Sequence, residues 1–152
     1  LLREVADGIP SATFNIIGAK PQIPSVVSNA PNIHWLGWID TDQLWRYGVN
    51  ADVGIIPFAQ TKLVEGVNPI KMYEYLACGL NVVASGCEDI KGFTPAVVVP
   101  ATANGFISAV VQGAEKTAEL RASAIKTKNR RKMLLGNTWG TRTDALLAAV
   151  SG

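Results

Sequence analysis

The stretch VNPIKMYEYLACGLNVVAS, residues 67–85, predicts a loop, then a helix, then a buried strand. Asn68 can cap the helix, because its side-chain oxygen can accept a hydrogen bond from a backbone N–H of the first turn. Pro69 suits the first helical position, where its missing N–H costs nothing, and Gly79 supplies the left-handed residue that ends many helices. The apolar, β-branched residues 81–84 then predict a short strand. The rest of the chain is organised around this helix and strand.

The start of this helix is a candidate anion site. Lys71 lies in the first turn, where free backbone N–H groups and the helix dipole also favour negative charge. Glu74 lies three residues further on, on the same face, and a carboxylate can accept hydrogen bonds from two sugar hydroxyls. The alternative is that Lys71 and Glu74 form an ion pair on the helix surface. Asn68 likewise either donates its amide to a phosphate or only caps the helix.

The composition bounds the class of protein. The chain has 152 residues, of which 48% are hydrophobic and 17% charged, which is typical of one soluble domain with a sizeable core. The net charge of +2 is too small to indicate a nucleic-acid partner. No apolar run approaches the roughly 18 residues of a membrane span, and no leader peptide is visible. The two cysteines are too few for a disulfide framework, so we expect a cytoplasmic location and a buried free thiol at Cys78.

Short apolar segments alternate with helical ones along the chain. The predicted strands are residues 12–17, 33–36, 52–57, 81–84 and 96–99. The predicted helices cover residues 1–6, 40–47, 69–78, 102–113, 117–135 and 138–150, and the predicted loops include 19–31, 58–67 and 85–95. This pattern predicts an α/β, Rossmann-like, three-layer domain, with a parallel sheet and helices on both faces. Ligands of such sheets bind at the carboxyl ends of the strands, so the loops after Leu36, Pro57, Ala84 and Val99 are the candidates.

The stretch at residues 67–85 also resembles the donor-binding segment of GT-B glycosyltransferases. It is most similar to bacterial polysaccharide enzymes of the glycosyltransferase group 1 and glucuronosyltransferase type, whose segment reads roughly N-P-x-K-x-x-E-Y-L-A-x-G-x-P-V-V. The matching residues are Asn68, Pro69, Lys71, Glu74, Tyr75, Leu76, Ala77, Gly79, Val82 and Val83. Asn81 stands where proline is usual. The broader family has two glutamates with seven residues between them; Glu74 matches the second, whereas the first falls on Gly66, and Glu65 lies one residue too far away.

The resemblance implies a set of donor contacts. Lys71 would pair with the donor diphosphate and Glu74 with the ribose hydroxyls. The turn after the second strand would hold the base, where Trp38 and Ile39 either contact the ring or simply pack on the loop. The donor-binding candidates are therefore Gly37, Trp38, Ile39, Asn68, Lys71 and Glu74. The candidates beside the transferred sugar are Thr61, Lys62 and Glu65.

By the same resemblance, residues 1–152 form half of a GT-B fold, its C-terminal donor-binding domain. The first strand of this domain, and an N-terminal domain that holds the acceptor and any catalytic base, would precede Leu1. Catalytic residues are therefore not assigned, and this chain alone is expected to be inactive. The parent enzyme would move a sugar, with a UDP-sugar favoured as donor, to a polysaccharide or lipid-linked acceptor without a further cofactor. Two alternatives stay open: a nucleotide-sugar epimerase on the same architecture, and a non-catalytic nucleotide-binding α/β module.

The sequence offers little for a metal. His34 is the sole histidine and lies in a predicted strand, where a structural role is more common than metal binding. Asp40 and Asp42 bracket Thr41, and we interpret them as a helix cap and a first-turn acid. We therefore expect no metal and propose that Lys71 and the helix dipole balance the diphosphate charge.

A basic run lies near the C-terminal end of the chain. It contains Lys126, Lys128, Arg130, Arg131 and Lys132, with no acid within it. The run is either a solvated helix face or a surface attracted to anionic lipid. The second interpretation would place the protein at the inner face of the plasma membrane as a peripheral protein.

Overall fold

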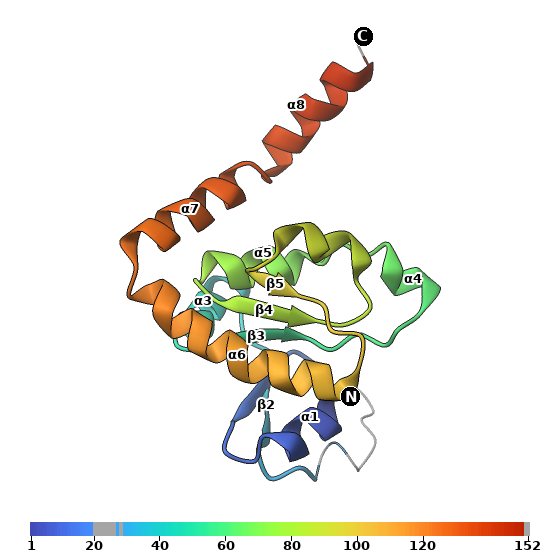
Figure 1. Cartoon of the computed structure of the whole chain (residues 1–152), viewed down its shortest axis with the longest axis vertical. Coiled ribbons are helices and arrows are strands. Elements are labelled where there is room, and N and C mark those ends of the chain that lie inside the picture. Colours follow the sequence, from blue (N-terminus) through green and yellow to red (C-terminus); the bar gives the residue numbers. More distant parts are fainter. Residues whose placement is uncertain (20–26, 28, 151–152) are drawn as a thin grey trace.

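The computed structural model describes residues 1–19, 27 and 29–150 (Figure 1). Its elements are, in chain order, α1 (Leu2–Gly8), β1 (Phe14–Ile17), β2 (Ile33–Gly37), the 3-10 helix η1 (Thr41–Gln43), α3 (Leu44–Gly48), β3 (Val53–Ile56), α4 (Lys62–Glu65), α5 (Ile70–Ala77), β4 (Asn81–Ala84), η2 (Glu88–Phe93), β5 (Val97–Val98), α6 (Ala103–Arg121), α7 (Ala124–Leu135) and α8 (Trp139–Val150). The loop predicted at residues 19–31 lies largely outside the described residues.

Every described strand pair is parallel, as the alternation of apolar segments predicts. β1 pairs with β2, with Phe14 opposite Ile33. β4 lies between β3 and β5, with Val82 opposite Gly54 on one side and Val97 on the other. The strands thus form a two-stranded and a three-stranded parallel sheet, and the α/β class predicted from the sequence is confirmed.

The central strand β4 packs against helices on both of its faces. All four of its residues are buried, as in parallel sheets covered on both sides. Val83 points toward Phe106 of α6, whereas Val82 points toward Met72 and Leu76 of α5. Complete burial of a large apolar side chain such as Met72 contributes about 1.5–3 kcal/mol. These two clusters make the three layers, with α5 on one face and α1 and α6 on the other.

The two sheets share one of these clusters. Phe14 and Ile33 of the two-stranded sheet belong to the same buried cluster as Val83 and Phe106. The Asn32 amide fastens this region further, since its Nδ2 donates to the carbonyl oxygens of Ala6 (2.9 Å), Ile9 and Ala12. The two sheets therefore pack around one shared cluster.

Helix α5 ends as predicted but begins differently. Gly79 is left-handed (φ +80°), and the N–H of Leu80 donates to the Tyr75 carbonyl at 3.0 Å, which is the Schellman pattern. At the other end Pro69 is extended (ψ 124°) and occupies the cap position, so the predicted Asn68 cap is wrong. The Pro69 carbonyl instead accepts from the Met72 N–H, so the backbone itself closes the first turn.

Two further boundaries differ from the prediction. The expected loop at residues 58–67 contains the short helix α4, which Thr61 caps by accepting from the Val64 N–H. The expected break after Gly113 is absent, because α6 runs on to Arg121 and Ser123 then caps α7. Gly113 serves packing instead: a Cβ there would lie 3.0 Å from a Val53 methyl. The glycine lets α6 approach β3 closely.

The C-terminal helices extend away from the sheet (Figure 1). α7 contacts α5 and α6, whereas α8 has no buried residue. Within the described part of the chain, no helix combines the length and the apolar character that crossing a membrane requires.

Candidate functional site

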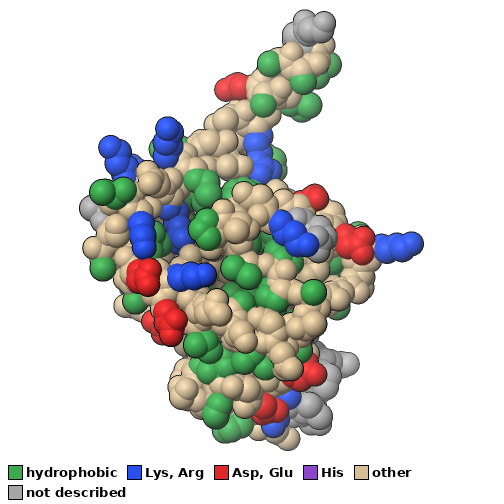
Figure 2. Space-filling model, in the orientation of Figure 1, with side chains coloured by type: hydrophobic (Ala, Val, Ile, Leu, Met, Phe, Trp, Pro, Cys, Tyr) green, Lys and Arg blue, Asp and Glu red, His purple; other side chains and the backbone are tan. Residues whose placement is uncertain are grey.

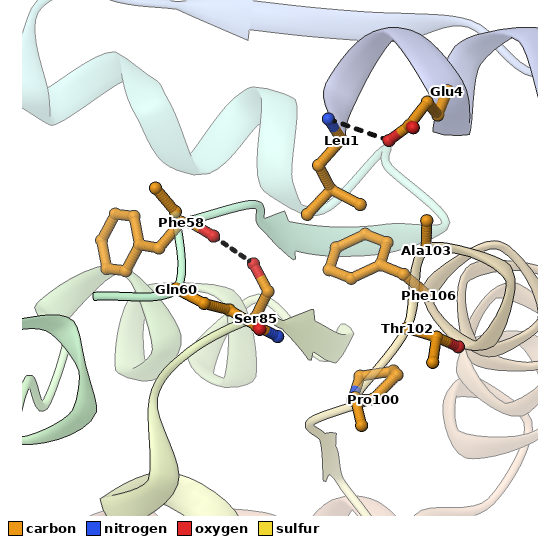
Figure 3. A pocket seen from close by; sticks show the side chains of 11 residues that line it. Leu1, Glu4, Phe58, Gln60, Ser85, Pro100, Thr102, Ala103 and Phe106 are labelled. Atoms are coloured by element: carbon orange, nitrogen blue, oxygen red, sulfur yellow. Dashed lines mark hydrogen bonds and ion pairs between the residues drawn. The ribbon is translucent and has the colours of Figure 1, made fainter. Parts of the chain in front are cut away.

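A cavity of about 320 Å³ opens at the carboxyl ends of β3, β4 and β5 (Figure 3). Three groups of residues form its wall: the loops after those strands, the start of α6 and the start of α1. They are Phe58, Ala59, Gln60, Ser85, Pro100, Ala101, Thr102, Ala103, Phe106, Leu1 and Glu4. Three of the four loops predicted to bind a ligand, those after Pro57, Ala84 and Val99, therefore meet here.

Ser85 holds the floor of this cavity together. Its buried hydroxyl donates to the Phe58 carbonyl at 2.6 Å, and its N–H donates to the Ile56 carbonyl. Gly86 then turns the chain with φ +78°, and a Cβ there would lie 2.9 Å from a Val64 methyl. The ends of β3 and β4 are thus tied together beneath the loop that leads into α4.

The start of α6 gives the cavity its electrostatic character. Thr102 caps this 19-residue helix, and its hydroxyl accepts from the Gly105 N–H at 3.1 Å. A helix N-terminus carries a partial positive charge and free N–H groups. Glu4 is the one charged side chain among the described residues that line the wall. The cavity therefore offers backbone donors and small hydroxyls rather than a cluster of charged side chains.

Lys71 and Glu74 lie outside this wall, on the exposed side of α5. Their Nζ and Oε2 atoms are 2.7 Å apart, and the two side chains are 55% and 42% exposed. The ion pair that the sequence left as an alternative thus exists in this structure. Such exposed pairs contribute about 0–1 kcal/mol, so a ligand phosphate can compete for the lysine at little cost. Next to this pair, burial and the Glu74 charge raise the pKa of Tyr75.

The turn after β2 has the backbone geometry that its glycine suggests. Gly37 is left-handed (φ +76°), and its carbonyl accepts from the Gly18 N–H at 2.8 Å. Trp38 is 77% exposed, so it does not pack on the loop, whereas Ile39 is half-buried. An exposed indole beside the carboxyl end of a parallel strand can stack on a planar ring.

The remaining predicted residues surround the short helix α4. The hydroxyl of Thr61 is used as its cap, and Lys62 and Glu65 are exposed on the helix itself. Gly66, which falls at the family's first glutamate position, ends the helix, and Asn68 is exposed without a capping bond. The structure thus brings together Lys71 with Glu74, but none of the nine predicted residues is in the cavity wall.

Sequence reasoning missed several polar residues that do line the cavity, namely Gln60, Ser85 and Thr102. The position of Ser85 directly after a buried strand was a usable signal, since it ends the strand next to a glycine. Thr102 was recognised only as the start of a helix.

Neither cysteine forms a disulfide. Burial raises the pKa of both thiols, at Cys78 and at Cys87, so both are poor nucleophiles at neutral pH. Among the residues that the structure describes, no three His, Cys, Asp or Glu side chains gather in a way that could hold a metal ion.

Comparisons with known proteins agree with this architecture. The model of a family described as "Glycosyl transferases group 1" matches residues 1–116, which include the cavity wall, Lys71 and Glu74. The chain is also similar to the protein named "Putative teichuronic acid biosynthesis glycosyltransferase TuaH" of Bacillus subtilis (strain 168), with 30% identity over 89 residues. That alignment covers 56% of this chain and 22% of the relative, so the chain spans about a fifth of the relative's length.

Proposed function

Because this chain belongs to the group 1 family of glycosyl transferases, we propose that it binds the nucleotide-sugar donor of a glycosyl transfer reaction. The observation that carries the proposal is the cavity at the carboxyl ends of three parallel strands, the edge at which α/β sheets bind ligands. The loop that covers this cavity leads through α4 into α5, which carries the exposed Lys71 and Glu74. The polysaccharide named for the relative, teichuronic acid, supports an acceptor of the surface-polysaccharide class.

The exposed side chains of Lys71, Glu74 and Trp38 are each free to contact the donor in the predicted way. Lys71 releases Glu74 and binds the donor diphosphate instead. This is favourable because a charge-assisted hydrogen bond to phosphate contributes about 1.5–3 kcal/mol, whereas an exposed ion pair contributes about 0–1 kcal/mol. Glu74 then accepts hydrogen bonds from vicinal ribose hydroxyls, and Trp38 stacks on the base. Positive charge on Lys71 and at the α6 N-terminus stabilises the diphosphate as it leaves. We keep Thr61, Lys62 and Glu65 as residues beside the transferred sugar.

We also propose that a strand from the residues before Leu1 completes the sheet between β1 and β3. β1 and β3 each pair on one side only among the described strands, yet they share a buried cluster. Val53 and Ile55 of β3 are half-buried, unlike the fully buried β4. Leu1 lies in the cavity wall, so a strand parallel to β3 could end there and lead into α1. The resulting order is the doubly wound one.

Transfer itself would need the rest of the parent protein. We propose that the acceptor and the catalytic base belong to a domain outside these residues, and that this chain alone binds donor weakly and transfers nothing. We still predict contact between α7 and an anionic membrane, but two of the five basic residues in the run are already engaged within the protein. Lys126 pairs with Glu119, and Arg130 donates to Leu80 and Asn81. Lys128, Arg131 and Lys132 are left for such a surface.

A two-dimensional NMR titration with UDP, then GDP, ADP and NAD, tests the donor site. We expect UDP to shift amides at residues 37–39 and 70–74 and around the cavity. Lys71→Ala should weaken UDP binding about tenfold, the loss of one charge-assisted bond. Lys128→Ala removes an exposed lysine from α7 and is the matched control. Unchanged UDP affinity in Lys71→Ala, with a well-dispersed spectrum, would remove this lysine from the site, and a preference for NAD would favour the alternative of another nucleotide-binding module.

Hydrogen exchange tests the missing strand. In the 152-residue chain, amides of β1 and β3 that face away from their paired strand should exchange much faster than those of β4, because water reaches them. In a longer chain that carries the preceding residues, the same amides should become protected and UDP should bind more tightly. Equal exchange rates of the β1 and β3 amides in the two chains would refute the proposal of a strand between them. Tight UDP binding without any sugar transfer by the longer chain would favour the non-catalytic module.

A further inference from the structure

A second cavity lies away from the candidate donor site and is larger, about 480 Å³. It opens to solvent between the C-terminal ends of α5 and α6 and one side of α7, next to Leu80, where β4 begins. The residues that line it are Leu76, Ala77, Cys78, Gly79, Leu120, Arg121, Thr127, Arg130, Arg131 and Leu134. We refer to it as the arginine pocket. None of its residues lines the carboxyl-end cavity.

Three guanidinium groups line this pocket without a carboxylate partner. Within the described part of the chain, Arg121, Arg130 and Arg131 form no ion pair, although other lysines and arginines do. Arg130 is half-buried and donates to neutral acceptors, the Leu80 carbonyl at 2.6 Å and Asn81 Oδ1 at 2.9 Å. Burial lowers the pKa of Arg130, as expected for a charge that nothing nearby balances. The pocket therefore carries net positive charge from three residues.

Arg130 is held in place by a buried polar network. The Asn81 amide donates to Thr117 Oγ1 at 3.2 Å and to the Gly113 carbonyl at 3.4 Å. Its oxygen is thereby left to face Arg130, and the Asn81 N–H also donates to Thr117 at 2.9 Å. A guanidinium has five N–H donors in a fixed fork, and two of its nitrogens are used here. The rest of the fork remains for a ligand.

A structural role accounts for only part of this arrangement. Cations near helix C-termini are favourable by about 0.3–1 kcal/mol, and α5 and α6 both end at the pocket. Arg121 fits that role at the end of α3, because it donates to the carbonyl of Gly48, and Arg130 donates to the carbonyl of Leu80 just beyond α5. Arg131 is exposed at the pocket and donates to no protein acceptor among the described residues. The third charge is therefore free for a ligand.

The floor of the pocket is apolar. Leu76 and Leu120 are buried and Leu134 is half-buried beneath the arginines. A volume in this range suits a small organic ligand, and the planar guanidinium matches the oxygens of a phosphate better than an ammonium does. We propose that the arginine pocket binds the phosphate group of an amphipathic phosphate ester, with Arg121, Arg130 and Arg131 on the phosphate and the three leucines against its apolar part.

Figure 2 shows Lys and Arg side chains together with Asp and Glu side chains on the α6 and α7 side of the molecule, and Arg131 of the pocket is exposed to solvent. The phosphate ester could thus be a free small molecule or the headgroup of an anionic lipid, and the test separates these two sources. The proposal does not rest on the proposed donor site, because the two cavities share no residue.

The probe is phenyl phosphate, titrated by NMR at constant ionic strength, with inorganic phosphate and phenol as its charged and apolar halves. We expect saturable shifts at residues 76–79 and 120–131, and tighter binding of phenyl phosphate than of either half. Arg131→Gln should weaken that binding about tenfold, the equivalent of one charge-assisted bond. Lys132→Gln removes the same charge from the neighbouring residue, which does not line the pocket. This control should change the affinity for phenyl phosphate less than twofold. UDP shifts at the donor site should be the same in both variants.

Vesicles identify the source of the phosphate. Retention on phosphatidylglycerol vesicles but not on phosphatidylcholine vesicles, lost in Arg131→Gln and kept in Lys132→Gln, would identify a lipid headgroup. Binding of phenyl phosphate with no retention on either vesicle would identify a free small molecule. Equal losses in Arg131→Gln and Lys132→Gln would show only diffuse attraction and overturn the proposal. So would the absence of saturable shifts in the pocket.

Discussion

The two ends of the three-stranded sheet present opposite surfaces. At the carboxyl end, the cavity is walled by loops, by the hydroxyls of Ser85 and Thr102, and by the N-terminus of α6. At the amino end, the arginine pocket is walled by the C-termini of α5 and α6 and by three guanidinium groups. One cavity has backbone donors and few charges, whereas the other has charged side chains over an apolar floor.

The polarity of the fold explains this difference. Helices that follow parallel strands begin at the carboxyl end of the sheet, where their dipoles supply partial positive charge, and they finish at the amino end, where the dipoles are negative. An anion at the carboxyl end is thus favoured by the backbone itself. At the amino end the arginines must offset the helix ends before they can attract an anion. Substituting a single wall residue should therefore weaken anion binding more in the arginine pocket than in the carboxyl-end cavity, where the donors are backbone groups.

We expect the largest effect at the amino end of the sheet from substitution of Asn81. This side chain is buried and joins Thr117, Gly113 and Arg130. Asn81→Ala leaves Arg130 without its side-chain acceptor in a half-buried position, and we expect a loss of about 2–3 kcal/mol in the free energy of unfolding. Urea unfolding followed by tryptophan fluorescence measures it. Asn15→Ala, at an exposed residue of β1, is the matched control and should change stability by less than about 0.5 kcal/mol.

The same variant sharpens the comparison between the two ends. At temperatures where Asn81→Ala is folded, phenyl phosphate should bind less tightly, since Arg130 has lost part of its support. UDP binding at the other end should be unchanged. A loss of UDP affinity equal to the loss of phenyl phosphate affinity would mean that the two ends do not act independently.

The parallel α/β fold could be predicted because its signals are local. Buried parallel strands are short apolar runs, and Gly79 ends α5 with the left-handed residue and Schellman bonds that a glycine there suggests. The start of α5 was harder, since Asn68 followed by proline resembles a capped start although Pro69 is extended. Gly113 resembles a helix end in the sequence. Its actual role, leaving space for the Val53 side chain of β3, depends on a long-range contact that no local pattern indicates.

The sites were predictable to different degrees. The topology alone selects the loops after β3, β4 and β5, and the cavity lies at those loops. Among the wall residues, only Ser85 has a usable signal, its place directly after a buried strand; Gln60 and Thr102 belong to no pattern that indicates a site. The ion pair of Lys71 and Glu74 follows from their spacing of three. The arginine pocket escaped prediction because Leu76 and Arg121 come together only in the folded chain.

The smallest effect we predict uses the two cysteines as reporters, one at each end. Cys78 is half-buried in the wall of the arginine pocket, whereas Cys87 is 0% exposed and follows Ser85 and Gly86 beyond the carboxyl end of β4. A thiol reagent at pH 7.5 should modify Cys78 slowly and leave Cys87 unmodified until urea unfolds the chain. Phenyl phosphate in the pocket should slow the reaction at Cys78 further. Equal rates for the two thiols in the folded chain would contradict this prediction.

The same two thiols give the direction of a pH dependence. Burial raises the pKa of each thiol in the folded chain, so the unfolded chain loses these protons first as the pH rises. Between the unfolded and folded pKa values the folded state holds more protons, and its stability therefore falls with rising pH. The thiol contribution is complete below an ordinary thiol pKa of about 8.5 and is lost above it. Urea unfolding at pH 7.5 and 9.5 should show lower stability at pH 9.5, and Cys87→Ser, whose hydroxyl does not titrate in this range, should reduce that difference. A difference unchanged in Cys87→Ser would assign the alkaline loss to other groups.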